Sequence, residues 1–453
     1  MNVPGVEPPV DPAVDWDRYE SIVRGADLVR LTGRVTGYVG LTVEADGPHA
    51  KIGDLCTLED LQTRQKLPAE VIGFRHGRVL LMPLGDGRGI GPGWVVSATG
   101  DVLSANVGDE LLGRVVNALG VPIDSGPALS ASLRRPLDDS PPHPLKRPRI
   151  TDRLTTGVRA IDTLLTIGKG QRIGLFAGSG VGKSTLLGMI AKTSAADVNV
   201  IALVGERGRE VRDFLERDMS PDALARSVTV VCTSDQAALL RIKAAQTATA
   251  IAEYFRDRGA DVMLLMDSIT RWALAQREVG LAAGEPPTTR GFPPSVFALL
   301  PRLLERAGRS HRGSITGIYT VLVEGDDLAE PISDSCRSIL DGHIALSRRL
   351  ASQNHYPAID ILDSISRVAG DVLSPDERLM AGETRDLIAT YREAEDLIAV
   401  GAYKKGSSAR IDRAIAVYDL LNAFLRQDVG ETVADGQAWD DLRSVLAASL
   451  PTG

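Results

Sequence analysis

A glycine-rich turn between an apolar strand and a helix constrains this chain more than any other feature. Residues 176–185 read FAGSGVGKST, and they follow the short apolar run 172–176. Residues 185–191 carry apolar side chains at helical spacing. In a strand–turn–helix unit, successive backbone N–H groups and the positive end of the helix both face an anion. The order of these elements therefore predicts a nucleotide site in an α/β domain.

The residue types of this turn each suit one part of a nucleoside triphosphate. Lys183 would reach the β- and γ-phosphates, and the hydroxyl of Ser184 would ligate Mg²⁺. The general pattern G-x-x-x-x-G-K-[ST] has a glycine where this chain has Ala177. The other glycines, the lysine and the hydroxyl are present, so we expect the turn to bind phosphate. The expected phosphate-binding residues are Gly178, Ser179, Gly180, Val181, Gly182, Lys183, Ser184 and Thr185.

Composition narrows the class of protein. The chain has 453 residues, a formal net charge of −8 and only 4% aromatic residues, which argues against a protein that coats nucleic acid. Its three cysteines, Cys56, Cys232 and Cys336, lie far apart and suit buried thiols in a reducing compartment. No apolar run has membrane-spanning length, and the N-terminus lacks the apolar core of a signal peptide. We expect a soluble, cytoplasmic protein.

Changes in sequence texture divide the chain into four segments. We expect residues 1–30 to be flexible, with helical spacing over 15–24 that indicates either a docking helix or a helix packed on its own domain. Residues 31–99 alternate short β-prone runs with glycine turns, which predicts a small β-barrel. The candidate strands of this barrel are residues 33–39, 41–45, 70–74, 78–82 and 94–97.

The two remaining segments predict an α/β domain and a helical bundle. Residues 100–372 alternate apolar strands with helices, as in a mostly parallel (RecA-like) sheet covered on both faces. Residues 373–453 begin with a capping box at Ser374 and Glu377 and continue with two apolar stripes at helical spacing. The expected strands of the sheet are residues 173–176, 198–204, 228–232, 262–266, 315–323 and 344–346.

Two of these strands end in acidic residues. Asp267 follows the apolar run 262–266, and at the carboxyl edge of a sheet it can hold a water of the Mg²⁺ shell beside the phosphate loop. Residues 200–204 deliver Glu206 and Arg207 to the same edge, where Glu206 suits alignment of an attacking water. Arg207 would fix this carboxylate or reach a neighbouring chain, and a surface ion pair is the alternative interpretation.

Phosphoryl transfer also needs a cation for the charge that develops on the γ-phosphate. An arginine in that position increases the rate by roughly 10³–10⁵. The phosphate loop contains no arginine, and Arg367, on a predicted loop after the strands, is our candidate across a subunit boundary. A structural salt bridge explains Arg367 equally well from sequence alone.

Several motifs together carry a resemblance to a known family. The chain resembles the type III protein-export ATPases, most closely the flagellar ones, and is more distantly similar to the catalytic subunit of rotary F-type ATP synthases. The resemblance covers roughly residues 30 to 430 and is most specific in the central segment. Its motifs are residues 177–185, 205–211, 267–271, 284–287, 291–295, 324–327, 340–343 and 356–367. Ala177 is itself typical of such export ATPases.

The resemblance implies roles for individual residues. Glu206 matches the catalytic glutamate, Arg271 an arginine near the γ-phosphate, and Arg367 the arginine that reaches into a neighbour's site. Tyr356 and Tyr403 match aromatic positions beside the adenine, and ordinary packing is the alternative for both. The expected catalytic residues are therefore Lys183, Glu206, Arg207, Arg271 and Arg367, with Ser184 and Asp267 toward Mg²⁺.

The resemblance also implies partners and a location. It implies ATP as the ligand, a homohexameric ring that exchanges with monomers, stalk-like regulatory and export-apparatus proteins, and complexes of export chaperones with their substrates. It implies no nucleic-acid partner. The location would be cytoplasmic, at the inner face of the cell membrane beside the export gate.

Four alternatives to a flagellar export ATPase remain. An injectisome (virulence secretion) ATPase has nearly the same motifs. An ATP synthase subunit is less consistent, because the C-terminal helices lack the long acidic loop that engages a rotor. An RNA translocase would need a basic, aromatic barrel, and residues 31–99 have few such residues. A non-catalytic ring subunit would lack Glu206.

Overall fold

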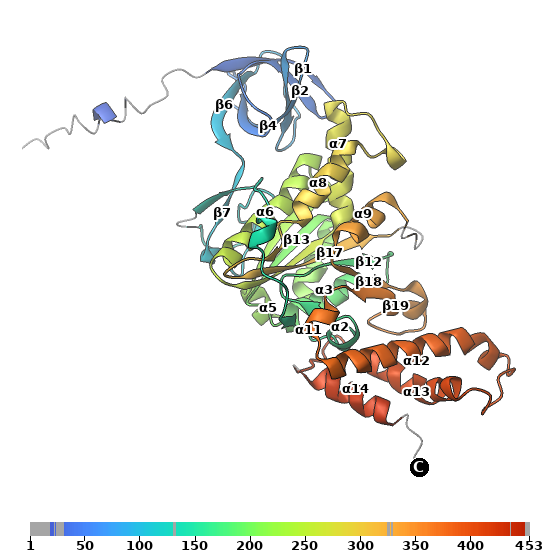
Figure 1. Ribbon diagram of the computed structural model, residues 1–453. Coiled ribbons are helices and arrows are strands. Elements are labelled where there is room, and N and C mark those ends of the chain that lie inside the picture. Colours follow the sequence, from blue (N-terminus) through green and yellow to red (C-terminus); the bar gives the residue numbers. More distant parts are fainter. Residues whose placement is uncertain are drawn as a thin grey trace, which may run out of the picture.

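The computed structural model of the chain describes residues 19–21, 23, 31–129, 133–323, 327, 329–434 and 436–448. Figure 1 shows a barrel, a sheet layered with helices and a group of C-terminal helices following one another in space. The predicted docking helix at 15–24 lies outside the described residues except for 19–21 and 23, which are helical. Residues 324–326 of one family motif also lie outside them. The predicted fold class is confirmed, and the segment boundaries remain predictions.

The N-terminal strands close into a barrel in the order β1-β2-β5-β4-β3-β6. Alternate side chains such as Val35, Val43 and Leu81 fill its interior. The five predicted strands are present, and the barrel contains a sixth, β3, in which Cys56 and Leu58 point into the barrel. The strands are β1 (Thr32–Val39), β2 (Thr42–Asp46), β3 (Asp54–Glu59), β4 (Lys66–Arg75), β5 (Arg78–Pro83) and β6 (Val95–Val102).

The central sheet runs in the order β19-β18-β12-β17-β15-β13-β14-β8, and β16 pairs with β17 outside this path. All strands from β18 to β8 along the path are parallel, whereas β19 and β16 are antiparallel to their neighbours. All six predicted strands are present. The strands are β8 (Val115–Asn117), β12 (Arg172–Ala177), β13 (Val198–Glu206), β14 (Ser227–Thr233), β15 (Asp261–Asp267), β16 (Gly308–Arg309), β17 (Ser314–Leu322), β18 (Gly342–Leu346) and β19 (Ile359–Ser366).

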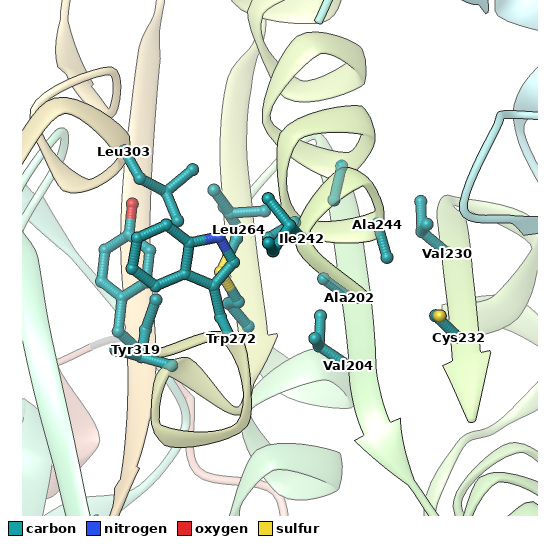
Figure 2. Packing of buried hydrophobic residues seen from close by; sticks show 14 of the residues in the cluster. Ala202, Val204, Val230, Cys232, Ile242, Ala244, Leu264, Trp272, Leu303 and Tyr319 are labelled. Atoms are coloured by element: carbon teal, nitrogen blue, oxygen red, sulfur yellow. The ribbon is translucent and has the colours of Figure 1, made fainter. Parts of the chain in front are cut away.

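Helices cover both faces of this sheet, which explains why its strands are almost continuously apolar. Val200, Ala202 and Val204 of β13 face one layer, and the alternating Ile201 and Leu203 face the other. Figure 2 shows side chains of the first layer, where Trp272 and Ile242 from helices lie against strand residues such as Leu264. The phosphate loop is therefore built on a rigid, two-sided core.

The helices of the central part connect and cover the strands. Helices α6, α7, α8 and α9 contribute to the first layer, and α2, α3 and α5 to the second. Their bounds are α2 (Arg159–Leu164), α3 (Lys183–Thr193), α4 (Gly208–Asp213), α5 (Pro221–Ala225), α6 (Ala238–Asp257), α7 (Ile269–Ala283), α8 (Pro294–Leu304), α9 (Pro331–Ile339), α10 (Arg348–Ser352) and α11 (Ala369–Val372). Two short ladders complete this part: β7 (Ser104–Val107) with β9 (Leu133–Pro136), and β10 (Arg153–Leu154) with β11 (Ile167–Gly168).

Three helices form the C-terminal part: α12 (Pro375–Ala399), α13 (Ala409–Leu425) and α14 (Gln437–Ala447). The predicted capping box is present, because Ser374 Oγ accepts from the Glu377 N–H and the Glu377 carboxylate accepts from the Ser374 N–H. Leu387, Val417 and Leu442 from the three helices join the same core as α2 and α3. The C-terminal helices therefore pack on the layer that carries the phosphate loop.

Candidate active site

The phosphate loop joins the end of β12 to the start of α3. Gly180 and Gly182 have φ angles of 78° and 92°, in the left-handed region that favours glycine. Gly182 is the N-cap of α3, so Lys183 is the first residue of the helix, at its positive end. A cleft of about 610 Å³ is lined by the loop and by residues of neighbouring strands. The loop thus has the backbone that an anion site at a helix N-terminus requires.

Four charged side chains meet at the carboxyl edge of the sheet beside this loop. Glu206 ends β13 and Asp267 ends β15, and both are buried. The ammonium of Lys183 donates to Asp267 Oδ1 and lies 3.5 Å from Glu206 Oε1. Arg271, in the first turn of α7, places its Nε 3.3 Å from Glu206 Oε1. The sequence predicted that Glu206 and Asp267 share this edge beside the phosphate loop, and the structure places both there.

Burial controls the protonation of Glu206. Desolvation raises the pKa of Glu206 from 4.5 to about 7, and a hydrogen bond with the Glu210 side chain and the charge of Asp267 act in the same direction. Lys183 and Arg271 oppose these effects. The hydrogen bond that raises the pKa of Glu206 lowers that of Glu210. Without nucleotide, Glu206 is therefore a carboxyl group that changes charge near neutral pH.

The donor set of the cleft fits a hydrated Mg²⁺ ion. Asp267 is 4% exposed, and its Oδ1 accepts hydrogen bonds from Lys183 and from Thr320 Oγ1, the latter at 2.7 Å. The exposed hydroxyl of Ser184 lines the same cleft. Mg²⁺ in nucleotide sites typically takes one or two protein oxygens, with water and phosphate supplying the rest. Ser184 and Asp267 provide that number.

The structure places the other two predicted arginines outside this cleft. The side chain of Arg207 is 78% exposed and lies 3.8 Å from Glu210. Arg367 lies in the short bend that directly follows β19, so it is on a loop as we expected, although that loop is not separated from the strands. Its backbone N–H donates to the Asp341 carbonyl at 3.0 Å, and its Nη2 donates to the Arg337 carbonyl at 3.1 Å.

The register of β19 shows which end of the sheet Arg367 occupies. Ser366 pairs with Gly342 at the start of β18, and β18 runs parallel to β12. Arg367 therefore lies at the amino end of β12, whereas the phosphate loop follows its carboxyl end. An exposed side chain in this position cannot act on the phosphate loop of its own chain.

A second hollow, of about 550 Å³, adjoins the first on the other side of α3. The aromatic ring of Tyr356 borders it, 3.5 Å from where a β-carbon on Gly182 would lie. Tyr403 borders neither hollow; its hydroxyl donates to Asp412 Oδ1 at 2.9 Å within the C-terminal helices. The structure therefore places Tyr356, but not Tyr403, at the second hollow beside the phosphate loop.

Sequence reasoning missed part of this site. Glu210 borders the cleft from the first turn of α4, four residues after Glu206 ends β13, and its position in the motif 205–211 is the signal that could have indicated it. Arg348 also borders the cleft, and residues 426–429 and Glu431 form one wall of the second hollow. No local pattern indicated that wall, because it comes from a link between helices about 70 residues after Tyr356.

Within the described part of the chain, no helix is both long and apolar enough to cross a membrane.

Comparisons with known proteins agree with this architecture. Residues 157–366 match the nucleotide-binding domain of the ATP synthase alpha/beta family, and residues 35–100 match its beta-barrel domain. Residues 373–444 match the C-terminal domain of the type III secretion ATPase EscN.

Individual relatives match over nearly their full length. The "Flagellum-specific ATP synthase" of Bacillus subtilis is 55% identical over 89% of this chain and 93% of that protein. The "Type 3 secretion system ATPase" of Sinorhizobium fredii is 49% identical over 93% of both chains. The solved structure of the assembled ATPase EscN of enteropathogenic E. coli has a TM-score of 0.87 and 47% identity, over 91% of this chain and 100% of that chain.

These relatives therefore share the three parts of this chain: the barrel, the helix-covered parallel sheet with the phosphate loop, and the C-terminal helices. The chain belongs to the ATP synthase alpha/beta family and, within it, to the ATP-hydrolysing export ATPases of flagellar and type III secretion systems.

Proposed function

We propose that this protein is the Mg²⁺-dependent ATPase of a flagellar protein-export apparatus, working as a ring of identical subunits. The observation that supports this most is the meeting of Lys183, Glu206, Asp267 and Arg271 beside the phosphate loop. The loop residues Gly178 to Thr185 contact the phosphates, and Tyr356 contacts the base.

Each charged residue has a separate part in hydrolysis. Lys183 leaves Asp267 and holds the β- and γ-phosphates when ATP binds. Ser184 and Asp267 face the Mg²⁺ ion, which neutralises phosphate charge when bound. Glu206 in its ionised form accepts a hydrogen bond from the attacking water and aligns it with the γ-phosphorus. The water oxygen forms the new P–O bond while the bond to the β-phosphate oxygen breaks, Glu206 takes up the proton that the water loses, and ADP and inorganic phosphate leave.

Arg271 and Arg207 keep Glu206 and its surroundings in place. Arg271 pairs with Glu206 and compensates its charge once the carboxyl is ionised. Arg207 is exposed at the start of α4, where a neighbouring subunit is within its reach. Arg367 stabilises the charge that develops on the γ-phosphate held by the adjacent subunit.

The assembly and its partners follow from the relatives. The EscN relative was solved as an assembled ATPase and in complex with its central stalk EscO. By analogy, this chain forms a homohexamer around a stalk-like protein and receives complexes of chaperones with export substrates. It works in the cytoplasm, peripheral to the inner face of the membrane at the export gate.

Substitution of Glu206 tests the enzymatic part of the proposal. Glu206→Gln should bind ATP and lose at least about 10²-fold in turnover, because the neutral amide cannot polarise the water. The matched control is Glu216→Gln, an exposed glutamate paired with Arg212, which should keep the wild-type rate. Full ATPase activity of Glu206→Gln would refute the assigned role.

An injectisome ATPase is the second candidate, because type III secretion ATPases such as that of Sinorhizobium fredii are 49% identical to the chain. Expression in a non-motile strain that lacks its flagellar ATPase separates the two. Restored swimming supports the flagellar assignment, and rescue only of a secretion-deficient injectisome strain contradicts it.

A further inference from the structure

The wall of the second hollow opposite Tyr356 is held together by one buried glutamine. This hollow lies beside α3, and both Tyr356 and Pro357 and residues 426–429 line it. Residues 426–429 lie in the link between α13 and α14. These two segments are distant in the sequence, so contacts between them must determine how far apart they lie.

Gln427 makes the contacts that fix it. Its side chain is buried, and Oε1 accepts from the backbone N–H of Arg159 at 2.9 Å. Its Nε2 donates to the carbonyls of Gly157 at 2.8 Å and Glu431 at 3.1 Å. Its own backbone N–H donates to the Tyr356 carbonyl at 2.9 Å. One residue therefore joins the start of α2, the Tyr356 segment and the link between α13 and α14.

Neighbouring contacts strengthen this junction. Arg159 Nη1 donates to the Phe424 carbonyl at 3.2 Å and to the Arg426 carbonyl at 2.9 Å, where α13 ends. Thr193, in the last turn of α3, donates its hydroxyl to the Thr156 carbonyl at 2.5 Å. The phosphate-loop helix, α2 and the C-terminal helices are thus connected through backbone groups around Gln427.

We infer that Gln427 is a positioning residue for the nucleotide base. Through its bonds to residues 157–159, Tyr356 and Glu431, it fixes the distance between the Tyr356 ring and the 426–429 wall. Tyr356 is 42% exposed, and its ring is available to stack on a planar base. This inference rests on the proposed function, because it takes the hollow to hold the base of the ATP whose phosphates occupy the loop.

The arrangement also couples nucleotide binding to the C-terminal helices. A base held between Tyr356 and residues 426–429 contacts the central part and the α13–α14 link at once. Binding therefore orders that link, and an intact Gln427 junction lowers the conformational freedom that binding must remove. The phosphate-side residues Lys183 and Glu206 make no contact with the junction, so the chemical step does not depend on it.

Substitution by methionine, which has similar length and no amide, tests this role. Gln427→Met should raise KM for ATP about tenfold and leave kcat within about twofold, since it removes base binding common to ground and transition states. In hydrogen exchange, ADP should protect residues 426–434 in the wild type, and this protection should be lost in Gln427→Met. The control Gln62→Met changes an exposed glutamine of the barrel and should behave as wild type.

An unchanged KM in a folded Gln427→Met protein, or equal losses in kcat and kcat/KM, would overturn the inference. Retained ADP protection of residues 426–434 in the variant would do so as well. Failure of the proposed function has a different signature, because the wild type itself would then bind no ADP and hydrolyse no ATP.

Discussion

Arg367 should act only on the nucleotide of a neighbouring subunit. The six residues of β12 separate the amino end of the sheet, where Arg367 lies, from the phosphate loop. At 3.3 Å per residue this is about 20 Å. Two unit charges that far apart in water interact by only about 0.2 kcal/mol. A 10³–10⁵-fold contribution to the rate requires about 4–7 kcal/mol, so Arg367 cannot supply it within its own chain.

Mixing of two inactive variants measures this directly. Arg367→Ala keeps an intact nucleotide-binding half, and Glu206→Gln keeps an intact arginine. In randomly mixed rings at equal amounts, about one interface in four combines the intact half of each variant. ATPase activity should therefore return to about a quarter of the wild-type rate, measured as phosphate release after the variants are dissociated and reassembled together.

A second mixture is the control. Lys183→Ala and Glu206→Gln both damage the nucleotide-binding half, so their mixed rings contain no intact site and should stay inactive. Wild-type activity of Arg367→Ala alone, or no recovery in mixed rings of confirmed hexameric mass, would refute the shared site.

Two further predictions concern ionisable groups in the core. Because the folded state keeps Glu206 protonated up to about pH 7, the ligand-free protein loses stability as pH rises from about 4.5 to about 7. Glu206→Gln removes this penalty, so the stability of the variant relative to wild type should rise across this pH range and reach at most about 3 kcal/mol at pH 8. A difference in melting temperature between the two proteins that stays constant from pH 5 to 8 would contradict this prediction. In the central part, Arg306 forms a two-pronged ion pair with Glu253 at 2.9 and 2.8 Å, and both side chains are buried. Arg306→Met should cost about 3–5 kcal/mol in urea unfolding, because the Glu253 carboxylate loses its main cation, whereas Arg443→Met at an exposed pair should cost less than about 0.5 kcal/mol.

The sequence predicted best those elements whose signal is local. Strands β12, β13 and β15 have long apolar stretches between polar or charged residues near their ends, and the strand–turn–helix around Lys183 has few alternative folds. For the same reason Glu206 and Asp267 could be placed at one sheet edge, since parallel strands bring their carboxyl ends together.

Elements fixed by distant contacts were harder to predict. Strand β3 is short, its apolar residues Leu55, Cys56 and Leu58 do not alternate regularly with polar ones, and its acidic ends resemble a loop. After Leu362, strand β19 has few apolar residues, because residues 363–366 border an open surface hollow. Residues 426–429 border the second hollow through bonds to distant parts of the chain, such as those of Gln427 and Arg159, which no spacing rule reveals.

Particle mass and ATPase rate, measured together across a dilution series, test the central claim that one subunit holds the nucleotide and the next completes the site. We predict that the rate per subunit rises in proportion to the fraction of subunits in rings and falls toward zero for monomers. A constant rate per subunit across the transition from ring to monomer would contradict the claim.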